Sequence, residues 1–380
     1  MIAWFYKYGF VLLLLNTILY SIPETNITIA PTIFYFLMGT GLILLIIDPS
    51  QIKDVIFHRS FLFLLLISLI NLVYFLFFES EFNQDSLEFL MARFVQFSLI
   101  SLSIYHNYDY YKKKFSSLII KVISIIVVLG LFVDPDLLSG RYYGIIWNPN
   151  MLASLSVLAF SFVLMKNEKR TNLDVLLLIL FFIVSIATGS RLALLIITVS
   201  FIYKFGLSIR NVFYAIIGFI LLFLISSIDL NTSFNRFSSQ DILNDRTDQF
   251  NFAVNNLEKE FWFGYGLSEY SGLPSNVDVP EEYQGLLIAS HNGYLSIFLQ
   301  YGIIFGFFII LIIMRKSLML SSYFIRKEQK DNIFLFIVIL TLIASMFETL
   351  LTGINEFHTI LFWFSLSYLS YSKYLQDYED

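Results

Sequence analysis

The chain has no cysteine and few charged side chains. Without cysteine, disulfides, thiolate chemistry and cysteine-ligated metals are excluded. The chain also lacks a Gly-rich phosphate loop, an internal repeat and the basic tail that would suggest nucleic acid as a partner. What remains to interpret is a large excess of apolar side chains and a few polar segments between them.

The apolar excess sets the class of protein. Hydrophobic residues make up 57% of the 380 positions and charged residues 14%, with a mean hydropathy of +0.74. A soluble core cannot hide that much apolar surface, so we predict an all-α polytopic membrane protein with a single transmembrane domain over residues 1–380. The first run, MIAWFYKYGFVLLLLNTILY, has one lysine and no small-residue cleavage site. We expect it to be a retained span rather than a signal peptide.

Apolar runs long enough to cross a bilayer predict about twelve transmembrane helices. Their approximate limits are 2–20, 29–47, 60–78, 87–105, 115–133, 149–165, 173–188, 190–206, 210–228, 293–314, 332–350 and 355–372. The seventh and eighth runs touch at Thr188-Gly189-Ser190-Arg191, which predicts a tight hairpin.

Lysine and arginine are distributed unevenly between the two predicted sides. With the N-terminus inside, 17 basic residues fall on the cytoplasmic face and 5 outside, and Arg93 and Lys121 fall within spans. The five external residues are Arg141, Arg191, Arg236, Arg246 and Lys259. The positive-inside rule therefore predicts a multi-pass protein with both termini cytoplasmic and residues 229–292 forming a large external loop. The abundance of Phe, Ile, Asn and Lys with little Ala suggests a bacterial source, so we expect the membrane to be the bacterial plasma membrane.

The external loop carries two candidate functional residues. An amphipathic helix is predicted over about 245–261, ended by Gly264 and Gly266, because apolar residues recur at helical spacing; they are Phe250, Val254, Leu257 and Phe261. Arg246 falls in the first turn, where the helix dipole disfavours a cation, so it serves function or pairs with Asp248. His291 closes the loop at the membrane–water boundary, as a functional imidazole or a structural one.

Other polar residues lie close to predicted spans. Arg191 begins a span and is either a functional residue or a snorkelling interfacial arginine. Arg93 lies inside the fourth span, with Glu88 as a candidate partner. Two carboxylate pairs, Asp134 with Asp136 and Glu79 with Glu81, could hold a divalent metal or be solvated helix ends. The last external turn is bracketed by three more titratable residues, Glu348, Glu356 and His358.

An arginine cluster at the outer membrane surface, with a histidine nearby, suits an anionic lipid head group. A guanidinium binds phosphate bidentately and stabilises charge on a departing diphosphate. A neutral histidine can take a proton from an attacking hydroxyl. Together these roles fit glycosyl transfer from a lipid diphosphate, although residue spacing alone does not name that reaction.

Four motifs follow one another along the chain. They are GRYYGIIWNPN around Arg141, the TGSR hairpin, the helix from Arg246 that ends in FWFGYGL, and HNGYLSIFLQYGIIFG from His291. These motifs resemble the O-antigen polymerase and O-antigen ligase superfamily of bacterial envelopes. Their order, over roughly residues 140–310, is similar to the family pattern. The HN motif before a glycine-containing span is the most specific element.

The resemblance implies a C-type membrane glycosyltransferase that acts on an undecaprenyl-diphosphate-linked glycan outside the membrane. It implies His291, Arg246 and Arg191 as catalytic residues, with Arg141, Asn150 and Asn292 binding substrate. The first external loop, around Glu24, has one acid where metal-dependent relatives carry a pair. We therefore expect no metal and no cofactor. The lipid bilayer and a chain-length regulator are the other candidate partners.

Three functions remain open at this stage. A polymerase would join repeat units on the lipid carrier into O-antigen, capsular or exopolysaccharide, and its size and aromatic, alanine-poor composition favour this function. An O-antigen ligase would use the same donor site and transfer the glycan to another acceptor. A polysaccharide transporter or flippase is disfavoured, because such proteins show internal repeats and polar residues at mid-membrane.

Overall fold

The fold is helical throughout the part of the chain that the structure covers. The computed structural model describes residues 2–79, 84–137, 140–166, 169–226, 241–269, 290–329 and 332–379, and no strand occurs among them. The prediction of an all-α protein is confirmed. Within those ranges, three helices are long and apolar enough to cross a membrane, and several shorter helices are apolar as well. Twelve spans remain a prediction.

Most helices coincide with predicted spans to within a few residues. The N-terminal part contains α1 (Ile2–Leu19), α2 (Pro23–Asn26), α3 (Ile29–Ile47), α4 (Pro49–Ile56), α5 (Leu62–Phe77) and α6 (Gln84–Val133). The middle contains α7 (Pro149–Leu164), α8 (Asn172–Ala187), α9 (Arg191–Phe205), α10 (Ile209–Ser226) and α11 (Asp241–Lys259). The 3₁₀ turn η2 (Leu267–Glu269) precedes α12 (Gly293–Arg326), α13 (Ile333–Ala344) and α14 (Phe357–Glu379).

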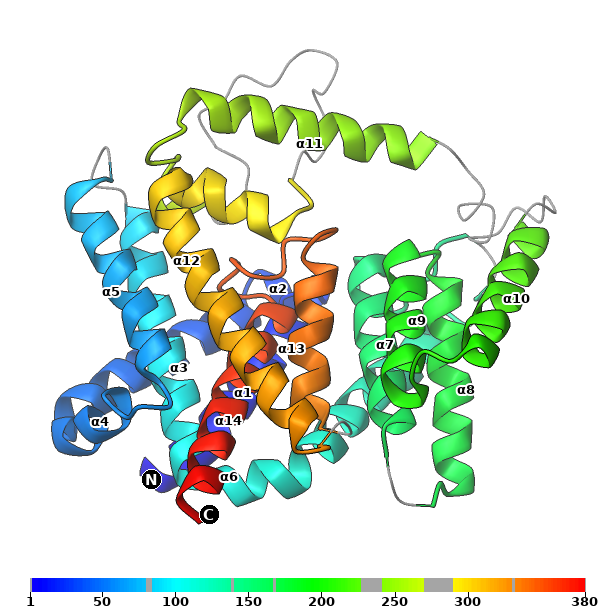
Figure 1. The fold of residues 1–380 in the computed structure, drawn as a ribbon, viewed down its shortest axis with the longest axis horizontal. Coiled ribbons are helices and arrows are strands. Elements are labelled where there is room, and N and C mark those ends of the chain that lie inside the picture. Colours follow the sequence, from blue (N-terminus) through cyan, green and yellow to red (C-terminus); the bar gives the residue numbers. More distant parts are fainter. Residues whose placement is uncertain are drawn as a thin grey trace.

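Two long helices differ from the spans predicted for them. The fourth and fifth predicted spans are joined in α6, which kinks at Asn107 (φ −135°, ψ 31°). The tenth span, predicted as 293–314, is broken at Gly302, whose φ of 67° lies outside the helical region. Residues 293–301 therefore form a short arm at an angle to the long descending part of α12 (Figure 1).

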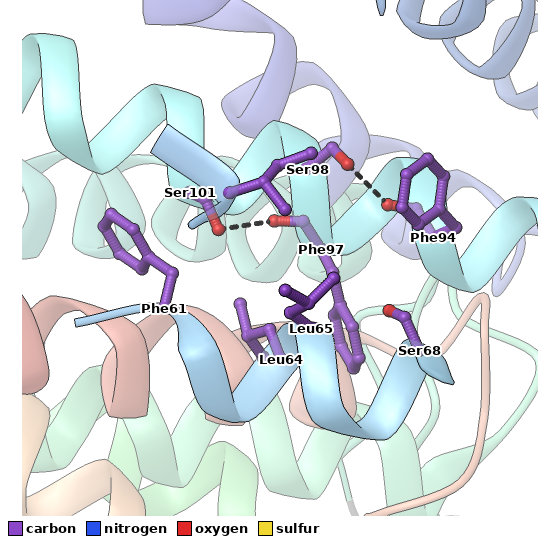
Figure 2. A pocket seen from close by; sticks show the side chains of 9 residues that line it. Phe61, Leu64, Leu65, Ser68, Phe94, Phe97, Ser98 and Ser101 are labelled. Carbon is purple, nitrogen blue, oxygen red and sulfur yellow. Dashed lines mark hydrogen bonds between the residues drawn. The ribbon is translucent and has the colours of Figure 1, made fainter. Parts of the chain in front are cut away.

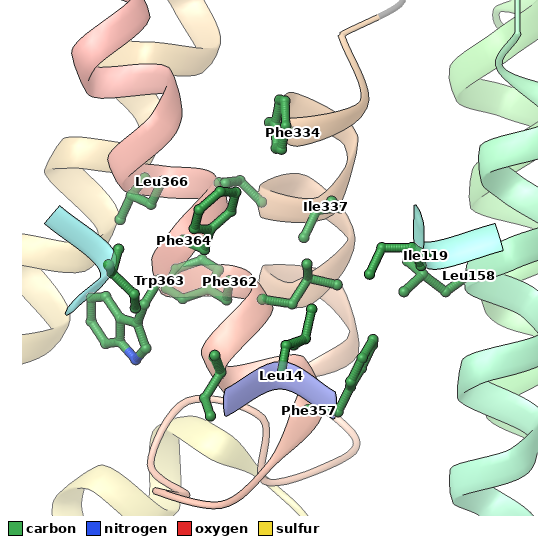
Figure 3. Packing of buried hydrophobic residues seen from close by; sticks show 14 of the residues in the cluster. Leu14, Ile119, Leu158, Phe334, Ile337, Phe357, Phe362, Trp363, Phe364 and Leu366 are labelled. Carbon is green, nitrogen blue, oxygen red and sulfur yellow. The ribbon is translucent and has the colours of Figure 1, made fainter. Parts of the chain in front are cut away.

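The main core is centred on α14. Side chains on every side of this helix are buried, from Phe362 through Leu366, as expected for a helix enclosed by others. Phe364 stacks on Phe10 of α1 with ring centroids 3.9 Å apart, and Tyr368 stacks on Phe334 of α13 at the same distance. Figure 3 shows Phe334 of α13 together with Phe362 and Phe364 of α14, whereas Trp363 points away from α13 and packs on Phe97 of α6. The C-terminal helix thus organises α1, α6, α12 and α13 around itself.

A second group of helices is built around α7, whose residues from Leu152 to Leu164 are all buried. It packs against α8, α9 and the second half of α6. Large apolar side chains on the outer helices stay exposed, including Ile46 of α3, Leu76 of α5 and Leu176 of α8. Such surfaces are stable against lipid rather than against water.

One end of the bundle is covered by α11, and both termini lie at the opposite end (Figure 1). Ala253 of α11 packs on Leu295 and Leu299 of the α12 arm. The helix lies where an amphipathic helix is predicted but begins earlier, at Asp241. Phe250, expected on its apolar face, is 46% exposed, whereas Asn256 is almost fully buried.

Candidate functional site

His291 and Glu348 form a close pair at the end of the bundle that α11 covers. Their Nδ1 and Oε2 atoms are 3.1 Å apart, although the residues are separated by 57 positions in the chain. The side chains are 27% and 17% exposed, so the pair is shielded but still accessible. His291 has a φ of 42°, a left-handed conformation that is costly for a residue other than glycine. Strain of this kind tends to occur at functional sites.

The turn that follows His291 fixes the direction of its side chain. Asn292 caps α12, and its Oδ1 accepts hydrogen bonds from the Tyr294 and Leu295 amides at 3.0 Å. Its Nδ2 donates to the Met346 carbonyl at 3.3 Å, and the Gly293 amide donates to the Ser345 carbonyl at 2.7 Å. The HN motif is therefore attached at two further points to the segment that carries Glu348.

The segment between α13 and α14 is supported from its other side by α6. Arg93 is buried in the core and donates to the carbonyls of Thr352 and Gly353. Gln96, one turn further along α6, donates to the Ile354 carbonyl. Glu88, the partner considered for Arg93 from the sequence, instead accepts a hydrogen bond from Tyr35 at 2.9 Å. The buried guanidinium thus satisfies two backbone carbonyls of a segment that lies outside the helices.

A second group of predicted residues gathers around the α8–α9 hairpin. Arg141 donates to the Thr188 carbonyl at 3.1 Å through Nε and to Asn150 Oδ1 at 2.6 Å through Nη2. The next amide, that of Tyr142, donates to the Ala187 carbonyl at 3.1 Å. The Arg141 loop, the start of α7 and the TGSR hairpin are therefore held together as one unit.

Arg191 is the first residue of α9, and Ser190 is its N-cap. Gly189 turns the chain with a φ of 64°, which is why so few residues suffice for the turn between α8 and α9. The side chain of Arg191 is half-buried at this turn. The predicted hairpin is therefore the element that places Arg191 beside the Arg141 loop.

Arg246 lies in α11, and its side chain is outside the described residues. The helix places residue 246 on the element that crosses the covered end of the bundle (Figure 1). Because α11 starts at Asp241, residue 246 lies in the second turn rather than the first. The dipole argument made from the sequence is weaker there, since the effect is confined to the first turn.

Two glycines lock the end of the α11 segment against the kink of α12. Gly264 (φ 71°) and Gly302 (φ 67°) face each other, and a Cβ on Gly264 would lie 2.6 Å from the Leu299 carbonyl oxygen. The amide of Ile303 donates to the Phe261 carbonyl, and that of Tyr265 donates to the Leu299 carbonyl. The FWFGYGL and YGIIFG motifs are thus two halves of one contact.

The membrane helices hold this contact from the other side. Tyr74 of α5 donates from its hydroxyl to the Phe263 carbonyl at 2.6 Å. Glu79 accepts from the Leu267 amide at 3.2 Å and from Ser86 at 2.7 Å. Glu79, one of the acids considered for a metal, therefore anchors the segment that follows α11 to α5 and α6.

The remaining metal candidates give no ligand cluster among the described residues. No group of three histidine, aspartate or glutamate side chains is arranged to hold an ion within that part of the chain. Asp134 instead accepts a hydrogen bond from the Asp136 amide at 3.4 Å, just after α6 ends. Glu81 lies outside the described residues.

A small pocket between α5 and α6 is no substrate site. Phe61, Leu64 and Phe97 line it, and its volume of about 10 Å³ leaves room for a single water at most. Its serines are engaged with their own helix, since Ser98 and Ser101 donate to the carbonyls of Phe94 and Phe97 (Figure 2).

Comparison with protein families connects these groups. Residues 176–311 match the family model described as O-antigen ligase. The match supports the O-antigen ligase and polymerase superfamily. It begins within α8 and ends within α12, so it includes the TGSR hairpin, α11 and the HN motif. No curated protein matches the chain.

A match to this family supports a glycosyl-transferring enzyme that acts on lipid-linked glycans in a membrane. The match stops before Glu348, the partner of His291 in this structure. Sequence reasoning noted Glu348 only as an acid near the last external turn. The signal that marks it is a carboxylate between two apolar helices, where an ionisable group needs a partner or a function.

Proposed function

We propose that the chain polymerises undecaprenyl-diphosphate-linked repeat units into a cell-envelope polysaccharide at the outer face of the plasma membrane. The observation that carries the proposal is the His291–Glu348 pair at the membrane end of the external segment. A histidine oriented by a carboxylate is the arrangement that enzymes use to activate a hydroxyl nucleophile.

The geometry of the pair suggests how the proton of the acceptor hydroxyl is removed. When Glu348 is ionised it accepts a hydrogen bond from the Nδ1–H of His291, which fixes the tautomer whose Nε2 carries the free lone pair. Nε2 then takes the proton of the acceptor sugar hydroxyl as its oxygen attacks the anomeric carbon of the donor. The bond from that carbon to the diphosphate oxygen breaks, and the electron pair leaves with the diphosphate.

The arginines balance the charge that develops on the leaving group. We assign this contact to Arg191 and Arg246, since a guanidinium fork matches phosphate oxygens bidentately. Arg141 instead donates to the Thr188 carbonyl and to Asn150, and this geometry favours a role in positioning the hairpin that carries Arg191. Asn292 acts in the same way on the histidine side, through its cap and its contact with Met346.

A ligase reaction is the second candidate, because the matching family model is described as O-antigen ligase. Both reactions break the same donor bond and differ in the acceptor. The length and the aromatic, alanine-poor composition of the chain favour the polymerase.

Purified full-length protein in detergent, given an undecaprenyl-diphosphate oligosaccharide alone, tests the proposal. We expect a ladder of longer products on a gel. A His291→Ala protein prepared in parallel is the inactive control. Product that forms only after a second acceptor lipid is added would replace polymerase with ligase. No product with either acceptor, from protein shown to be folded, would overturn glycosyl transfer.

A further inference from the structure

A large cavity lies at the end of the bundle opposite His291. It encloses about 540 Å³, within the range of small-molecule sites in proteins. Its walls come from the middle of α6, the end of α7, the start of α13 and the last turns of α14. This is the end where both chain termini lie (Figure 1), far from the His291–Glu348 pair.

One wall of the cavity is polar and carries positive charge. Lys112 and Lys166 line it, together with the hydrogen-bonded hydroxyls of Tyr108 and Ser372, 2.8 Å apart. Lys166 is paired with Asp174. Lys112 is exposed, and its Nζ lies 5.9 Å from the centroid of the Tyr108 ring. The next two residues of α6 are also exposed lysines, and Glu328 is the one carboxylate among the described lining residues.

The opposite wall is apolar. It is formed by Phe162, Met165 and Phe334, from the end of α7 and the start of α13. A cavity with ammonium and hydroxyl groups on one side and apolar side chains on the other matches a phosphate ester attached to a hydrocarbon chain. The excess of lysine and arginine at this end places it at the cytoplasmic leaflet, where anionic lipids gather and basic pockets between helices bind their head groups.

We propose that this cavity binds the phosphate head group of an anionic phospholipid of the surrounding membrane. The shared chemistry is a phosphate ester, which a soluble glycerol phosphate also offers. The site is separate from the glycosyl-transfer residues, so its occupancy can be tested without any activity assay.

Native mass spectrometry of the purified full-length protein tests the site. The protein is incubated in detergent with phosphatidylglycerol or with phosphatidylcholine of the same acyl chains, and the retained lipid is counted. We expect phosphatidylglycerol to be retained in preference. Lys112→Gln should weaken its retention about five-fold, the effect of one basic charge near a lipid phosphate. Lys113→Gln is the matched control, because it removes the same charge from the same helix outside the cavity lining.

A second variant separates binding in the cavity from attraction to a basic surface. Ser116→Phe adds bulk at the cavity wall without changing charge, so it should abolish retention of the lipid only if the lipid occupies the cavity. Equal loss in the Lys112 and Lys113 variants, or equal retention of the two lipids, would overturn the proposal. Displacement of the lipid by millimolar glycerol phosphate would overturn the lipid as the occupant.

Discussion

At the scale of single residues, the His291–Glu348 contact gives the sharpest expectation. Glu348→Gln preserves shape but removes the charge that holds the imidazole tautomer. We expect the transfer rate to fall about 10- to 100-fold, as for other groups that orient a functional histidine. His291→Ala should cost more, about 10²- to 10⁴-fold, because the base itself is lost. The measurement is the initial rate at saturating donor, with donor binding assayed separately.

Glu88→Gln is a suitable control for the pair, since this acid accepts a hydrogen bond from Tyr35 and lies elsewhere in the fold. It should leave the rate unchanged. A Glu348→Gln protein with full activity would show that the histidine acts without its carboxylate partner. Full activity in His291→Gln would reduce the histidine to a positioning role.

The arginines separate by the same reasoning. Arg191→Lys and Arg246→Lys replace a bidentate fork with a point charge, so each should lose most of the transfer rate. Arg141→Lys should lower thermal stability as well, because Nε and Nη2 of Arg141 donate hydrogen bonds to Thr188 and Asn150. Transfer rates and melting temperatures of the three variants, measured side by side, distinguish arginines that contact the diphosphate from one that positions the hairpin. Wild-type rates in the double Arg191→Lys and Arg246→Lys protein would exclude both as diphosphate ligands.

Residues such as His291 and Arg191 were visible in the sequence because they stand out against an apolar background. Their partners were not, since the partner of His291 is 57 positions away and that of Arg93 is a pair of backbone carbonyls. Hydropathy marks where a charge is unusual but carries no information on which distant loop meets it.

At the scale of elements, helix positions followed closely from the apolar runs; α3, for example, has the predicted limits of 29–47. The kink of α12 could not be predicted from the apolar runs, because a single glycine in an apolar run is also compatible with a straight span. The bend depends on tertiary contact, since Gly302 meets the backbone of Trp262 and Phe263. The buried face of α11 was predicted only in part: Val254 and Leu257 pack against the arm of α12, whereas Phe250 is exposed and Asn256 is buried, with a hydrogen bond to the Phe252 carbonyl.

Gly302→Ala tests whether this contact holds the external segment in place. An alanine there would take a left-handed conformation and press its Cβ against the Phe263 amide, at a cost of about 2 kcal/mol or more. We expect a lower melting temperature in detergent and a lower transfer rate. Gly39→Ala is the control, because Gly39 is helical with no atom near its Cβ position and should be neutral or slightly stabilising. Equal melting temperatures for the two variants would contradict the role of the kink.

At the scale of the whole molecule, the charge asymmetry in the sequence and the arrangement in the structure describe the same two ends. The sequence assigns 17 basic residues to the cytoplasmic side and 5 to the outside. The structure places α11 at one end and both termini at the other (Figure 1). Neither observation depends on the other, so their agreement favours an orientation with the His291–Glu348 pair outside.

The absence of cysteine makes this orientation directly measurable. We expect Glu258→Cys, on the exposed face of α11, to react with a membrane-impermeant maleimide in intact cells. Lys113→Cys, exposed on α6 at the opposite end, should react only after the membrane is permeabilised. Both side chains are exposed, so a difference in labelling reports the side of the membrane rather than burial. The reverse pattern would place the glycosyl-transfer residues in the cytoplasm, where the positive-inside rule would be violated by the same large margin.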